Sequence, residues 1–132
     1  MGDLNAVDIA HETHRQILKA HGAMRPEHEL IYGVGLPLGE VIEGLHIDDH
    51  FTMAVMPRHL IKSPEGPDRA VVEASLRAYE ATGLPRAHDK SFGFGCAEDP
   101  VPKTRFTVVG TEICADPGAV AAPLPKRQQL FV

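Results

Sequence analysis

The sequence has few cysteines and no long apolar run, and each shortage excludes a class of protein. Cys96 and Cys114 are too few for a disulfide framework and too far apart for a cysteine-type zinc site. Free thiols are the usual state in a reducing compartment. No apolar stretch approaches the roughly 20 residues that cross a membrane, and the N-terminus has no signal-peptide pattern. We therefore expect a soluble, intracellular protein.

The chain also has no excess of positive charge. Its 13 Lys and Arg residues are outnumbered by 18 Asp and Glu residues, which gives a net charge of −5. The molecule as a whole therefore does not attract nucleic acid by its charge. What is present is a globular composition: 132 residues, 43% of them hydrophobic, with 11 prolines and 12 glycines. This predicts one domain with a core, many turns and short elements.

Hydrophobic periodicity predicts the order of the elements. An amphipathic helix is predicted within residues 1–21, with Gly22 as its stop, and a second helix over residues 64–83, with Gly83 as its stop. Between these helices the patterns predict a short strand at residues 30–32 in an irregular connector and a β-hairpin at residues 41–56. After the second helix they predict a polar loop at residues 84–92 and a glycine-broken extended stretch at residues 92–95. A second hairpin at residues 104–123 and the start of a helix at residues 124–132 follow. The predicted fold class is α+β, with antiparallel β-hairpins packed against two main helices.

Two adjacent carboxylates, Asp48 and Asp49, lie between the two apolar runs of the first predicted hairpin. Adjacent Asp residues are unfavourable in the middle of a strand and repel each other when buried, so the pair is expected at or beside the turn. Two interpretations are open at this point. The turn either is solvated or holds a divalent cation, which would offset the repulsion.

His11 and His14 are three residues apart on the first predicted helix, a spacing that can chelate a metal. Glu12 gives the stretch a superficial likeness to a zinc-protease helix, but the His-Glu-x-x-His order is absent. We therefore interpret the two histidines as surface or half-buried side chains.

Taken in order, several motifs give the sequence a resemblance to the palm domain of reverse transcriptases of the retroelement type, which are RNA-directed DNA polymerases. Ile47-Asp48-Asp49 on a hairpin resembles the x-Asp-Asp turn of polymerase motif C. The other matching stretches are Met1-Gly2-Asp3-Leu4-Asn5-Ala6 with its helix (motif B), Gly83-Leu84 through Asp89-Lys90-Ser91 (motif D), Phe106-Thr107-Val108-Val109-Gly110 (motif E) and Lys126-Arg127 at the start of the thumb.

The resemblance implies a role for each matching residue. Asp48 would be a direct ligand of Mg²⁺ (or Mn²⁺), with Asp49 as a secondary ligand, in a two-metal site for nucleotidyl transfer. Lys90 would approach the triphosphate of a dNTP and act as a general acid to pyrophosphate. The residues implied to contact the template-primer nucleic acid are Gly2, Phe106, Gly110, Lys126 and Arg127.

The sequence also departs from the pattern of this family. His46 stands where the family usually has Tyr, two residues before the first Asp. Polymerase motif A, which supplies another metal-binding Asp from a strand upstream of motif B, has no counterpart here, and the fingers are missing too. The expectation is an incomplete palm, a fragment that is inactive alone and would need the missing upstream fingers and palm segment as a partner.

Two alternatives from other function classes stay open. The first is a palm remnant retained as a non-catalytic module that binds nucleic acid or protein. The second is a metal-dependent hydrolase that uses His46, Asp48, Asp49 and His50, a set that could hold a transition metal.

Overall fold

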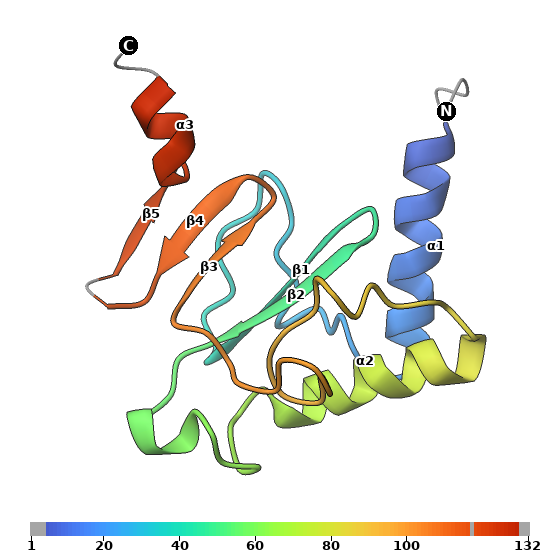
Figure 1. Cartoon of the computed structure of the whole chain (residues 1–132). Coiled ribbons are helices and arrows are strands. Elements are labelled where there is room, and N and C mark those ends of the chain that lie inside the picture. Colours follow the sequence, from blue (N-terminus) through green and yellow to red (C-terminus); the bar gives the residue numbers. More distant parts are fainter. Residues whose placement is uncertain (1–4, 117, 130–132) are drawn as a thin grey trace. The chain divides into compact units, whose positions relative to one another are not determined.

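The structure is a computed structural model, and it describes residues 5–116 and 118–129 (Figure 1). The chain divides into two compact units, Met1–Val101 and Pro102–Val132, which are considered one at a time. Across the described residues the secondary structure is α+β, with helices and two small antiparallel sheets. None of the helices in this part of the chain is long and apolar enough to cross a membrane. Both cysteines are free thiols.

Two α-helices form most of the core of the first unit. Helix α1 spans Ala6–Ala20 and helix α2 spans Arg69–Thr82. Leu18 of α1 and Ala74 and Ala78 of α2 form a small buried cluster with Ala23 and Met24, which follow α1 in the chain. The buried residues of α2 are Arg69, Val71, Ala74, Ser75 and Ala78. Val72, Leu76 and Tyr79 are partly buried.

The ends of the two helices follow local chemistry. Gly83 has φ +67° and ends α2 in the left-handed conformation, as the sequence predicts. The start of α2 was predicted too early, at residue 64. Proline and glycine at 64, 66 and 67 disfavour helix, and the buried Arg69 side chain donates hydrogen bonds to the carbonyls of Ile61 (2.7 Å) and Ser63 (2.8 Å). These bonds hold the preceding chain as a loop, in which a short 3₁₀ turn, η1, spans Arg58–Leu60.

The predicted first hairpin is present. Strand β1 spans Val41–His46 and strand β2 spans Asp49–Ala54, paired antiparallel from Val41 with Ala54 to His46 with Asp49. Residues 41, 43 and 45 of β1 share one face of the sheet. Val41 and Glu43 are buried on that face, and Leu45 packs against the core cluster.

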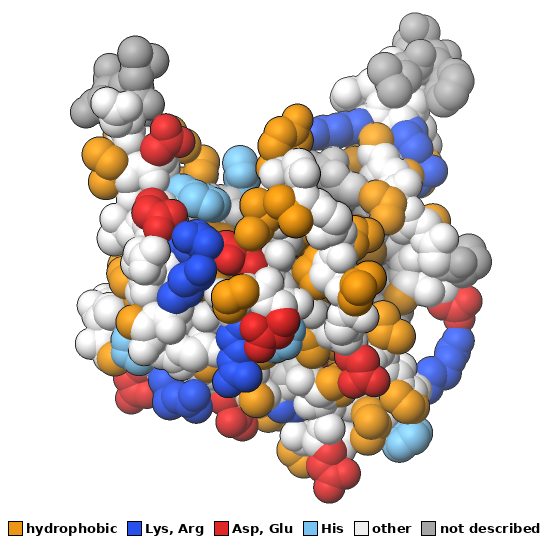
Figure 2. Space-filling model, turned by 180° about the vertical axis from the view of Figure 1, so that it is seen from behind, with side chains coloured by type: hydrophobic (Ala, Val, Ile, Leu, Met, Phe, Trp, Pro, Cys, Tyr) orange, Lys and Arg blue, Asp and Glu red, His pale blue; other side chains and the backbone are white. Residues whose placement is uncertain are grey.

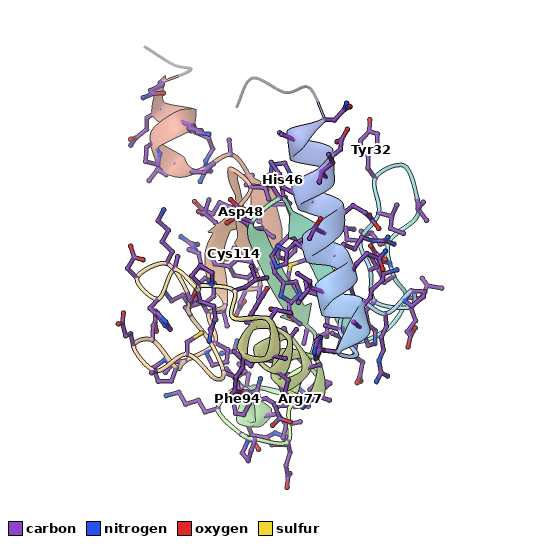
Figure 3. All side chains as sticks on the ribbon, turned by 90° about the vertical axis from the view of Figure 1, so that its right-hand side faces the viewer. Tyr32, His46, Asp48, Arg77, Phe94 and Cys114 are labelled. Atoms are coloured by element: carbon purple, nitrogen blue, oxygen red, sulfur yellow. The ribbon has the colours of Figure 1, made fainter. Side chains whose placement is uncertain are left out.

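The connector between α1 and β1 contains no strand, so the strand predicted at residues 30–32 was wrong. Only an isolated parallel bridge joins Glu29 to Glu43. The chain then turns, with a hydrogen bond from the Val34 N–H to the Ile31 carbonyl (3.1 Å) and with φ +78° at Gly33. Tyr32 at this turn is fully exposed (Figure 3). Apolar side chains are also exposed on the face that Figure 2 shows.

The loop predicted at residues 84–92 is confirmed as turns and irregular chain after α2. The extended stretch predicted at residues 92–95 was wrong, because Gly93 and Gly95 have φ +100° and +81° and the chain bends there. A Cβ at Gly95 would lie 2.5 Å from Leu76 Cδ1. The loop therefore packs closely on α2, which accounts for the partial burial of Leu76.

The second unit holds a three-stranded meander in place of the predicted hairpin at residues 104–123. Strands β3 (Arg105–Val108), β4 (Thr111–Cys114) and β5 (Ala119–Ala121) pair antiparallel in that order. Pro117, between β4 and β5, lies outside the described residues. A short helix, α3, follows at Leu124–Gln129, where the sequence predicts the start of a helix.

Candidate functional site

Asp48 and Asp49 lie at the tip of the β1–β2 hairpin. His46 pairs with Asp49, so Ile47 and Asp48 form a two-residue turn and Asp49 is the first residue of β2. Both carboxylates are exposed. Figure 3 shows His46 and Asp48 close together at this end of the sheet. The placement predicted from the sequence, at or beside the turn, is confirmed.

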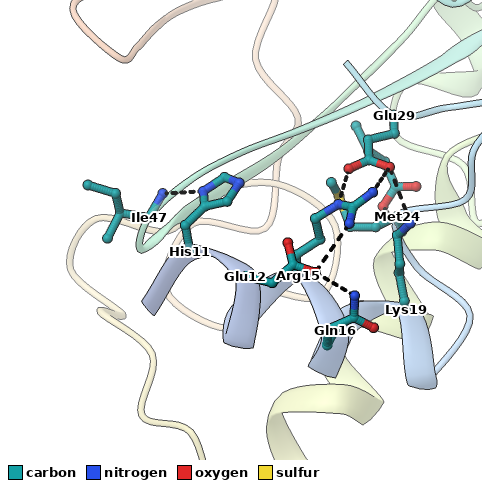
Figure 4. Close-up of polar contacts among 9 residues, drawn as sticks. His11, Glu12, Arg15, Gln16, Lys19, Met24, Glu29 and Ile47 are labelled. Atoms are coloured by element: carbon teal, nitrogen blue, oxygen red, sulfur yellow. Dashed lines mark hydrogen bonds and ion pairs between the residues drawn. The ribbon is translucent and has the colours of Figure 1, made fainter. Parts of the chain in front are cut away.

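The backbone of the turn is held by two histidines of α1. The N–H of Ile47 donates to Nδ1 of His11 at 3.2 Å (Figure 4), and Nδ1 of His14 lies 2.9 Å from the Ile47 carbonyl oxygen. The interpretation of both histidines as surface or half-buried side chains is in line with their partial burial, but sequence reasoning did not assign them this role. Their spacing of three residues, which places them on one face of the helix, was the available signal.

His14 is held in turn by Tyr79 of α2. The Tyr79 hydroxyl lies 3.0 Å from Nε2 of His14, and the two ring centroids are 5.6 Å apart. Burial raises the pKa of Tyr79 to about 12, so its hydroxyl keeps its proton at neutral pH. Because the carbonyl of Ile47 only accepts, Nδ1 of His14 must carry a hydrogen, and Nε2 of the neutral ring accepts one from Tyr79.

The other two histidines near the tip differ in direction. His46 is exposed, whereas the His50 side chain is buried, with Nε2 3.4 Å from Oε1 of Glu43. Successive side chains of a strand point to opposite faces, which separates His50 from Asp49. The structure therefore gives no support to a site that joins His50 to the two aspartates.

Glu43 is a fully buried carboxylate that sequence reasoning did not identify. Its Oε1 accepts the N–H of Met24 at 3.0 Å, and Nδ1 of His28 lies 3.5 Å from its Oε2. Burial raises the pKa of this carboxyl, but the hydrogen bonds from His50 and Met24 and the charges of the two histidines lower it, and the net pKa lies below its ordinary value. Glu43 is therefore an ionised group inside the core.

The two exposed carboxylates at the tip offer the oxygen ligands that Mg²⁺ takes. Within residues 5–116 and 118–129, however, no group of three or more His, Cys, Asp and Glu side chains is arranged to hold a metal ion. Asp48 and Asp49 would need a further ligand, either protein or substrate, to complete such a site.

The structure describes no contact between Lys90 and the hairpin tip. Lys90 is exposed in the loop after α2, and its backbone N–H donates to the Ala87 carbonyl at 3.0 Å. Gly2 lies outside the described residues.

The second unit brings together three of the residues predicted to bind nucleic acid. Gly110 occupies the β3–β4 turn with φ +70°, and a Cβ there would lie 3.4 Å from Nζ of Lys126. Arg127 follows Lys126 in the sequence, and its Nη2 lies 3.8 Å from Oε1 of Glu112. Phe106 is half-buried and pairs with Ile113 across β3 and β4. The Lys126–Arg127 end of this unit is basic, but Glu112 offsets part of that charge.

Comparison of the chain with protein-family models, with curated proteins and with solved structures finds no match in any of the three.

Proposed function

We propose that this chain carries part of a polymerase palm of the reverse-transcriptase type, with Asp48 and Asp49 as its metal-binding carboxylates. The observation that carries the proposal is the hairpin tip, where one carboxylate lies in a two-residue turn and the next begins β2, both exposed. A rigid hairpin tip presents carboxylates at a fixed separation to a cation. The order of the elements also supports the proposal: α1, the hairpin, α2, the loop with Lys90, then a second sheet followed by Lys126 and Arg127.

In this proposal each of these residues has a separate role in nucleotidyl transfer. Two Mg²⁺ ions, when bound, would lower the pKa of the attacking hydroxyl and neutralise the leaving pyrophosphate. Asp48 and Asp49 would bind and orient these ions through carboxylate oxygens. Lys90 would hold a proton near the triphosphate. Lys126 and Arg127 would contact phosphates of the primer strand.

The same geometry supports an inactive state for these residues on their own. The tip offers two carboxylates, and the described part of the chain contains no third group arranged with them. Removal of one metal ligand or one charge-stabilising group typically lowers an enzymatic rate by about a thousandfold or more, which is roughly 4 kcal/mol. We therefore expect no measurable nucleotide incorporation until a further carboxylate is supplied.

Titration with Mn²⁺, a paramagnetic substitute for Mg²⁺, tests the metal site. We expect weak binding that broadens the amide signals of residues 46–50 first, and we expect Asp48→Asn to abolish it. Asp89→Asn is the matched control, because Asp89 is an exposed aspartate in a loop outside the hairpin. Broadening that is equal in wild type and Asp48→Asn, or that centres elsewhere, would contradict the proposal.

Primer extension on an RNA template with Mg²⁺ tests the inactive state. The purified chain is expected to add no nucleotides. Extension that Asp48→Asn abolishes would show that the chain completes its own site.

The same preparations separate the proposal from the other two function classes. A non-catalytic binding module would bind nucleic acid in a salt-dependent way that survives Asp48→Asn and Asp49→Asn. A metal-dependent hydrolase would contain zinc or iron in stoichiometric amount. The direction of His50 toward Glu43 argues against that hydrolase.

A further inference from the structure

We propose that His11 and His14 are positioning residues that fix the direction of the Asp48 carboxylate through the backbone of Ile47. The inference rests on the proposed metal-binding role of the hairpin tip and assigns the group that holds that tip in place. We refer to His11, His14 and the backbone of Ile47 together as the histidine clamp.

The geometry of the clamp restrains two successive peptide planes. The Ile47 N–H belongs to the plane shared with His46, and the Ile47 carbonyl belongs to the plane shared with Asp48. Nδ1 of His11 accepts the Ile47 N–H at 3.2 Å, and Nδ1 of His14 lies 2.9 Å from the Ile47 carbonyl oxygen. The backbone nitrogen of Asp48 lies in the second of these planes. Holding that plane therefore restrains the Asp48 Cα and, through it, the direction in which the carboxylate leaves the backbone.

The turn needs such a restraint because its conformation is unfavourable for the residue it holds. Ile47 has φ +54°, a region that β-branched residues rarely adopt. Holding a residue there costs on the order of 1–3 kcal/mol and requires support from the surroundings. Glycine, asparagine or aspartate is the usual choice at such a position. The two hydrogen bonds from α1 are the recorded support for Ile47.

The two histidines must carry their hydrogens on different nitrogens. Nδ1 of His11 accepts from an N–H and so has no hydrogen, whereas Nδ1 of His14 donates to a carbonyl and so has one. The Ile47 carbonyl fixes the second arrangement because it can only accept, and Nε2 of the neutral His14 ring then accepts from the Tyr79 hydroxyl, 3.0 Å away. The clamp is therefore attached to α2 as well as to α1, and rotation of the His14 ring would break two hydrogen bonds.

Asparagine is the conservative replacement at both positions, because its amide oxygen or nitrogen can take the place of Nδ1 as acceptor or donor. Leucine fills a similar volume but can do neither. The test compares His11→Asn with His11→Leu, and His14→Asn with His14→Leu, in the full chain. His59→Leu is the control, because His59 is exposed in η1 and has no part in the clamp.

The measurements are the Mn²⁺ dissociation constant, the relaxation of the Asp48 amide signal and the imidazole nitrogen shifts of His11 and His14. We expect each leucine variant to weaken Mn²⁺ binding about 10-fold, the low end of the range for residues that orient metal ligands. The asparagine variants and His59→Leu should stay within about 2-fold of wild type. The nitrogen shifts should show opposite tautomers for the two rings at neutral pH. Thermal unfolding of every variant confirms that it folds.

The outcomes distinguish the two proposals. If wild type binds Mn²⁺ at the tip and folded leucine variants bind it equally well, the clamp inference is overturned while the metal site stands. Equal tautomers of the two rings overturn it as well. If wild type binds no Mn²⁺ at the tip, the proposed function fails and the inference fails with it.

Discussion

The guanidinium of Arg15 binds both carboxylate oxygens of Glu29. Its Nε donates to Oε1 and its Nη2 donates to Oε2 at 3.0 Å (Figure 4). Glu29 is buried, and the pair joins α1 to the chain segment that bridges to β1 at Glu43. Burial raises the pKa of the Glu29 carboxyl, but the Arg15 guanidinium and the nearby Lys19 ammonium lower it, with the net effect a lowered pKa. The two side chains therefore fix the position of the connector on α1.

Removing Arg15 should destabilise the first unit strongly. Arg15→Ala removes the guanidinium from the buried Glu29 carboxylate and leaves the Lys19 ammonium at 3.5 Å. Breaking a buried ion pair in this way costs roughly 3 kcal/mol. Arg15→Lys should also lower the free energy of unfolding, but by less than Arg15→Ala, because an ammonium cannot bind both carboxylate oxygens at once. Urea unfolding measures both changes. Glu12→Ala is the control, since Glu12 is an exposed partner of Arg15 at 3.4 Å and should contribute little.

Glu43 should make the stability of the first unit depend on pH in acid. Its pKa in the folded protein lies below the ordinary value of 4.5. A carboxyl with a lowered pKa stabilises the fold above its unfolded pKa, and that stabilisation is lost as the pH falls through the folded pKa. Glu43→Gln should therefore cost on the order of 2 kcal/mol at pH 7, and the difference from wild type should shrink below about pH 4.5.

Unfolding by urea at pH 7, 5, 4 and 3 measures this difference. Glu27→Gln controls for the loss of one negative charge, because Glu27 is exposed. A difference between Glu43→Gln and wild type that stays constant at every pH would show that the carboxylate charge is not what stabilises the core.

The elements that the sequence predicts well are those set by local chemistry. The hairpin at residues 41–56 follows from two apolar runs around a polar pair, and the end of α2 follows from a glycine that adopts φ +67°. The strand predicted at residues 30–32 depended on apolar and β-branched content alone. The chain forms a turn at Gly33 instead of a strand, because residues with a high β-propensity form a strand only when a neighbouring strand can pair with them.

The part of the site that the sequence does not predict depends on contacts between distant segments. The hydrogen bond from Ile47 to His11 joins residues 36 positions apart, and that from His14 joins residues 33 apart. A glutamate inside a strand is typical of a solvent-facing position, and only the Met24 N–H, His28 and His50 make burial of Glu43 tolerable. Such compensation is a property of the tertiary structure and leaves no periodic pattern in the sequence.

Gly44 is required by an aromatic ring on the neighbouring strand. It pairs with Phe51, and a Cβ at Gly44 would lie 2.0 Å from the ring atom Cζ. Gly44→Ala should therefore force the ring away and cost roughly 2 kcal/mol, as overpacking in a core does. In a Phe51→Ala background the same change should cost almost nothing. A double-mutant cycle in urea gives the coupling, and an equal cost of Gly44→Ala in both backgrounds would contradict the role of the ring.

The β3–β4 turn of the second unit should be improved by a single substitution. Val109 and Gly110 have φ +48° and +70°, the two positive values of a type I′ turn, in which Asn-Gly is the preferred pair. Val109 is about half exposed, so replacing it removes little packing and relieves a β-branched residue from a conformation that it disfavours. Val109→Asn should stabilise the hairpin by roughly 1 kcal/mol. Slower amide hydrogen exchange in β3 and β4 would show this stabilisation.

Val120→Asn is the matched control, because Val120 is also exposed but lies in strand β5, where asparagine is unfavourable. Stabilisation by both substitutions would assign the effect to lower surface hydrophobicity rather than to the turn.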